Sequence, residues 1–98
     1  MYRVFRVPAA QASRADAVWK DDLVSRQSIT SRDAKSLGLQ GDDRYVLVEG
    51  SDAGVTRATE LLKGLAHALA GKEAERVYRQ FRAQDEEAAS GMGLIFGP

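Results

Sequence analysis

Two stretches of the chain are apolar on both faces of an extended backbone, and each predicts a β-strand. Residues 2–7 (YRVFRV) form the first, and Pro8 ends it because proline has no N–H to donate to a sheet. Residues 45–49 (YVLVE) form the second. Because apolar groups occupy both of its faces, this stretch is predicted to be an inner strand of its sheet. Gly50 ends it.

Apolar residues spaced three and four positions apart predict helices elsewhere in the chain. The predicted helices cover residues 10–24, 52–70 and 72–90, and Gly71 separates the last two. A fourth, short helix is predicted to begin at a cap near Thr30, with an acid three residues later, and to stop at Gly38.

This order of elements predicts a single α+β domain over residues 1–98. The expected architecture is a two-layer sandwich, with a small, mainly antiparallel sheet covered on one face by helices. The order of the strands stays open. The C-terminal tail, residues 92–98 (MGLIFGP), is too apolar for a free end in water. We expect it to add a short strand or to dock on a neighbour.

Composition removes several classes of function. The chain has no cysteine, which excludes disulfides, thiolate metal sites and cysteine nucleophiles. Its 14 basic and 14 acidic residues are spread evenly, so no basic stripe favours nucleic acid. The first residues lack the apolar core of a signal peptide, and no stretch reaches the roughly 20 apolar residues of a membrane span. We therefore expect a cytoplasmic protein with no membrane partner.

Catalytic signals are weak. His67 is the only imidazole; the predicted helix places it near Glu60 and away from the leucines. A solvated histidine is the simpler interpretation, and a small-molecule site at His67 and Glu60 is the alternative. No serine stands in a G-x-S-x-G motif. No catalytic residue, metal ligand or cofactor is predicted, and the sequence favours a protein without enzymatic activity.

The turn at 50–54 (GSDAG) joins a predicted strand to a helix N-terminus, where free N–H groups can bind an anion. It lacks the glycine spacing of a phosphate-binding loop, and Asp52 would repel a phosphate. We expect Ser51 or Asp52 to cap the helix instead.

Two sets of residues are candidates for binding. Arg3, Arg6 and Tyr45 could form a surface for nucleobases or for another planar ligand. Leu94, Ile95 and Phe96 in the tail could form an apolar patch for a protein partner or for a second copy of the chain.

Residues 45–62 resemble the closing strand–helix unit of KH domains, which implies nucleic-acid binding through a GxxG loop. That loop is missing here. Gly38 and Gly41 have the spacing, but two aspartates follow them instead of a basic helix. Together with residues 32–39, the same unit resembles small archaeal α+β proteins, and this resemblance implies no activity.

The sequence therefore predicts a non-catalytic binding or adaptor module. The alternatives are an RNA-binding module of KH-like type and a small-molecule-binding protein. The ligand and the oligomeric state stay open.

Overall fold

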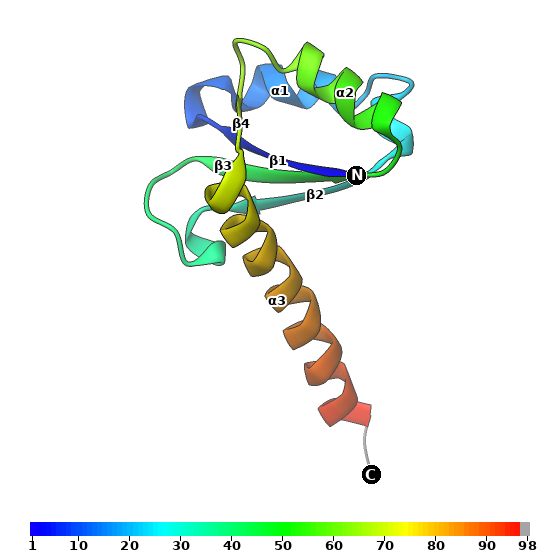
Figure 1. Cartoon of the computed structure of the whole chain (residues 1–98). Coiled ribbons are helices and arrows are strands. Elements are labelled where there is room, and N and C mark those ends of the chain that lie inside the picture. The colour runs from blue at the N-terminus through cyan, green and yellow to red at the C-terminus, as the bar shows by residue number, and fades with distance from the viewer. Residues whose placement is uncertain (97–98) are drawn as a thin grey trace.

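Four strands form one antiparallel sheet with the order β2-β3-β1-β4 in the computed structural model (Figure 1). They are β1 (Tyr2–Val7), β2 (Ser28–Asp33), β3 (Arg44–Glu49) and β4 (His67–Ala68). The structure describes the backbone of residues 1–96 and the side chains of residues 1–84. β3 lies between β2 and β1, which confirms the predicted inner strand.

Three α-helices connect or follow the strands: α1 (Ala12–Val18), α2 (Asp52–Leu61) and α3 (Gly71–Phe96). Short 3₁₀ turns occur at η1 (Ala9–Gln11), η2 (Val24–Arg26) and η3 (Lys35–Leu37). Up to β4, the order β1-α1-β2-β3-α2-β4 with this strand arrangement is the split βαβ, ferredoxin-like topology. Such a topology hosts many unrelated functions, so the function has to be argued from the surface.

One face of the sheet packs against α1 and α2, which lie together above it in Figure 1. Phe5 of β1 is opposite Val46 of β3, and both side chains point to this face. Val55 and Leu62 from the α2 region close over them, and each is at most 1% exposed.

The other face packs against the first turns of α3 and against η3. Val4 and Leu47 from the central strands meet Val77 and Phe81 of α3 in this second core. The α+β class and the antiparallel sheet are thus confirmed. The helical cover extends further than the one-sided sandwich expected from the sequence, because α3 crosses the second face.

Beyond Gln84, α3 runs away from the sheet and projects from the rest of the molecule (Figure 1). The molecule measures 49 × 29 × 26 Å as a result. The expectation that the apolar tail adds a short strand is wrong, since the backbone stays helical through Phe96.

The prediction of a short helix that begins near Thr30 is also wrong. Residues 28–33 instead form β2, which pairs along its whole length with β3. The predicted C-terminal stop at Gly38 is correct, with Gly38 in the left-handed region at φ 74° after η3.

Two predicted helices are too long. The helix expected over 10–24 covers only residues 12–18. The helix expected over 52–70 ends at Leu61, and the chain then turns through Gly64 at φ 80°. His67 and Ala68 pair with β1 instead of continuing the helix.

Candidate binding surfaces

Arg6 and Tyr45 are direct neighbours on β1 and β3, and they belong to a row that crosses all four strands. The row is Arg32, Tyr45, Arg6 and His67. Tyr45 is only 8% exposed, because it belongs to the core beneath α3. The Arg6 Nε lies 3.7 Å from the Asp43 carboxylate, an ion pair longer than a hydrogen bond.

Arg3 does not join this row. By strand alternation it faces the side of Phe5 and Val7, and so it points away from Arg6 and Tyr45. The three residues proposed together from the sequence therefore do not converge on one ligand.

Leu94, Ile95 and Phe96 belong to the last turn of α3. Their side chains lie outside the described residues. Successive residues on a helix point about 100° apart, so the three positions are spread around the axis of α3.

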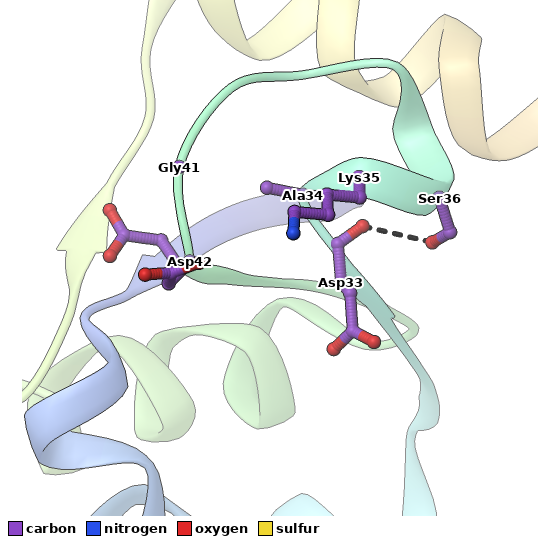
Figure 2. Close-up of a pocket in the computed structure, with 7 residues that line it drawn as sticks. Asp33, Ala34, Lys35, Ser36, Gly41 and Asp42 are labelled. Carbon is purple, nitrogen blue, oxygen red and sulfur yellow. Dashed lines mark hydrogen bonds between the residues drawn. The ribbon is translucent and has the colours of Figure 1, made fainter.

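The loop between β2 and β3 encloses a hollow of about 380 Å³, lined by residues 33–36 and 41–43 (Figure 2). The Ser36 hydroxyl donates a 2.9 Å hydrogen bond to the Asp33 carbonyl, and the Asp33 carboxylate points away from Ser36. Ala34 N–H also donates to the carbonyl of Asp43 at the mouth of the loop. These bonds hold the loop in a fixed shape.

Charges in this hollow are largely paired. Asp33 binds Arg44 at 3.1 Å, and Asp43 pairs with Arg6. Among the residues with described side chains, no three His, Asp or Glu groups are placed to hold a metal ion. The hollow therefore offers no cation site and no charged ligand anchor beyond Asp42 and Lys35.

The turn at 50–54 is filled by a side chain that sequence analysis did not find. Gln27 Oε1 accepts a 2.9 Å hydrogen bond from Ser51 N–H, and Gln27 Nε2 donates a 3.0 Å bond to the Leu23 carbonyl. Ser51 Oγ caps α2 by accepting from Gly54 N–H at 3.1 Å, as expected. The Gln27 carboxamide occupies the place that an anion would need, so this turn is structural.

Asp21 ties the loop after α1 to α2. Its carboxylate accepts a 3.1 Å hydrogen bond from Arg57 and 3.2 Å bonds from Leu23 N–H and Val24 N–H. The Arg57 hydrogen bond, followed by that of Val24, lowers the pKa of Asp21 below its ordinary value. These bonds explain the shift fully as a structural effect.

The structure places His67 on β4, in an exposed position beside Arg6. Glu60 lies on α2, whose neighbours are on the opposite face of the sheet. The suggested His67–Glu60 site is therefore split between two faces. None of the helices within residues 1–96 combines the length and apolar character of a membrane span.

One aromatic arrangement was missed from the sequence. Tyr2 of β1 and Tyr78 of α3 stack with ring centroids 4.0 Å apart and planes 17° apart. The Arg82 guanidinium lies 5.7 Å from the Tyr78 centroid. The i, i+4 relation of Tyr78 to Arg82 was the signal that the sequence offered for this arrangement.

Comparison with known proteins adds no family. No family model matches the chain, and neither the curated proteins nor the solved structures give a match. The resemblance to KH domains therefore stays a prediction, and the function has to be proposed from the surface.

Proposed function

We propose that the protein is a non-catalytic binding module and that the projecting half of α3 associates with a second copy of the chain. One observation carries the proposal: α3 continues past the sheet, and within the described part of the chain no other helix or strand lies beside residues 85–96 (Figure 1). At 1.5 Å per residue this segment extends by about 18 Å. Because most helical stability in proteins comes from packing of an apolar face, a partner along this segment would stabilise it.

The sequence of this segment supports a helical partner. At about 100° per residue, positions 88, 92 and 95 lie on the same side of α3 as Phe81, which packs on the sheet. They hold Ala88, Met92 and Ile95, so the apolar row of α3 continues where the sheet ends. In a two-fold dimer, a second copy of the chain presents the same apolar row to the first. Because the net charge of the chain is zero, the two copies do not repel each other through net charge.

Sedimentation velocity over a concentration series tests the proposal. The full chain should form dimers reversibly, and Ile95→Asp should shift the equilibrium to monomer. Leu94→Asp is the matched control, because position 94 lies about 140° around the helix from Phe81. A monomer at every concentration, or an equal effect of both variants, contradicts the proposal. A complex with an unrelated protein in place of the dimer would also contradict it.

A further inference from the structure

The stacked pair of Tyr2 and Tyr78 joins the first residue of the sheet to the third turn of the helix that crosses it. Tyr2 is 37% exposed, whereas Tyr78 is half-buried between Tyr2, Arg82 and the core. The pair therefore presents aromatic surface to solvent on its Tyr2 side. Stacking on Tyr78 fixes the orientation of the Tyr2 ring, and the Arg82 guanidinium lies over the ring of Tyr78.

Two cations, Lys72 and Arg79, lie beside the pair. Tyr2 and Tyr78 line a hollow of about 580 Å³ together with Gly71, Lys72, Glu75 and Arg79. Arg79 binds Glu75 at 2.6 Å, and so the single acid in the lining is already neutralised. Lys72 is exposed, which leaves the hollow positively charged.

A second, smaller hollow of about 240 Å³ adjoins the first and shares Tyr2 with it. Arg3 contributes to the lining of this second hollow, but strand alternation directs its side chain to the other face of the sheet. Arg3 is therefore given no contact with the ligand.

We propose that this surface binds single-stranded nucleic acid, with one base stacked on Tyr2 and the flanking phosphates near Lys72 and Arg79. A flat ring with cations beside it suits a ligand that is both planar and anionic. Stacking on an aromatic side chain accepts any base, and the cations neutralise the backbone. A duplex fits poorly, because its base faces are hidden in the stack. The surface differs from the Arg6 and Tyr45 region, and the proposal does not depend on dimerisation through α3.

Fluorescence anisotropy with a labelled single-stranded ten-nucleotide RNA, and with DNA of the same sequence, tests the proposal on the full chain. Tyr2→Ala should weaken binding about fivefold or more, since stacking contributes ~1–3 kcal/mol per base. Tyr2→Phe keeps the ring and should bind like the unmodified chain. Lys72→Gln should reduce the slope of log K against log salt by about 1.

Arg14→Gln is the matched control, because it removes an exposed cation from α1 on the opposite face of the sheet. It should leave affinity unchanged, and Ile95→Asp should do the same. Uridine monophosphate as a competitor separates a mononucleotide site from a strand site. If uridine monophosphate displaced the labelled strand at a concentration equal to that of the strand, the proposal of strand binding would be overturned.

Other outcomes also overturn the proposal. They are an absence of binding at low salt, affinity for a duplex equal to that for the single strand, and stronger binding to a polyglutamate peptide. If Tyr2→Phe and Tyr2→Ala lost affinity equally, the Tyr2 hydroxyl would be responsible for binding, and stacking on the ring would not. Thermal melts of each variant establish that the fold is retained.

Discussion

Gln27 fills the space beside Gly54 where any other residue would place its β-carbon. The three atoms nearest to that position all belong to the Gln27 side chain, and a β-carbon on Gly50 would meet the same carboxamide. The two glycines lie on either side of Ser51, the N-cap residue of α2. The turn is therefore built around an amide from the loop after α1, and this contact connects that loop to the second helix.

This contact predicts that Gly54→Ala changes the stability of the protein in opposite directions when the Gln27 side chain is present and when it is absent. Gly54→Ala should destabilise the protein by about 1–2 kcal/mol, because displacing Gln27 breaks its bonds to Ser51 and Leu23. In a Gln27→Ala background the space is open. There Gly54→Ala should stabilise the protein by ~0.5–1 kcal/mol, since alanine is the better helix former.

Urea unfolding of the four proteins in this cycle measures both effects. If Gly54→Ala destabilises the protein equally with and without the Gln27 side chain, then the overlap between the added β-carbon and Gln27 is not the cause.

The interior strands could be predicted because their signal is local. β1 and β3 are apolar on both faces, and only a strand with cover on each side explains this pattern. The structure shows that cover as α1 and α2 on one face and α3 on the other. Gly38 was predictable for a similar reason, because its freedom at positive φ marks the end of a turn.

The edge strands could not be predicted because pairing, not local pattern, determines them. Residues 28–33 (SITSRD) carry one aliphatic side chain, and their hydroxyls suit a helix cap as well as a strand. Their pairing with β3 decides between the two. The same holds for His67 and Ala68, which lie in a sequence typical of a helix and pair with β1.

The candidate site was only partly predictable from the sequence. The sequence named Arg3, Arg6 and Tyr45 as a candidate binding surface, but it could not show that Tyr78, 76 positions after Tyr2, stacks on Tyr2. Nor could it show that α3 buries Tyr45. Both facts depend on where a helix crosses the sheet.

The Asp21–Arg57 pair predicts a loss of stability in acid. Because folding lowers the pKa of Asp21 from 3.8, its contribution is complete above that value and is lost as the pH falls through the lowered one. The free energy of unfolding should therefore drop between about pH 5 and about pH 2, and Asp21→Asn should reduce this drop.

Denaturant unfolding at a series of pH values measures the difference between the two proteins. Asp22→Asn is the control, because its carboxylate is 95% exposed and pairs with Arg26 on the surface. This variant should keep the pH dependence of the unmodified chain. The same dependence in Asp21→Asn would show that other carboxylates cause it.

A substitution at Gly38 should change the stability of the protein through the backbone conformation alone, without a steric clash. A β-carbon at this position meets no atom within 4 Å, so only the left-handed backbone opposes a side chain. Gly38→Ala should destabilise the protein by about 1 kcal/mol, and Gly38→Asn by less, because asparagine tolerates this region better. Thermal unfolding compares the variants. A stabilising Gly38→Ala would mean that the turn changes its conformation.

Phe81 anchors α3 to the second face of the sheet, where it is 2% exposed and belongs to the core of Val4 and Tyr45. Phe81→Ala should therefore lower the free energy of unfolding by ~3–5 kcal/mol, because it removes a large side chain and leaves a cavity. Gln80→Ala changes the exposed neighbouring position and should have an effect within about 0.5 kcal/mol. Urea unfolding distinguishes the two variants. Similar small effects of both would mean that α3 does not pack on the sheet, and Tyr45 would then lie on an open surface.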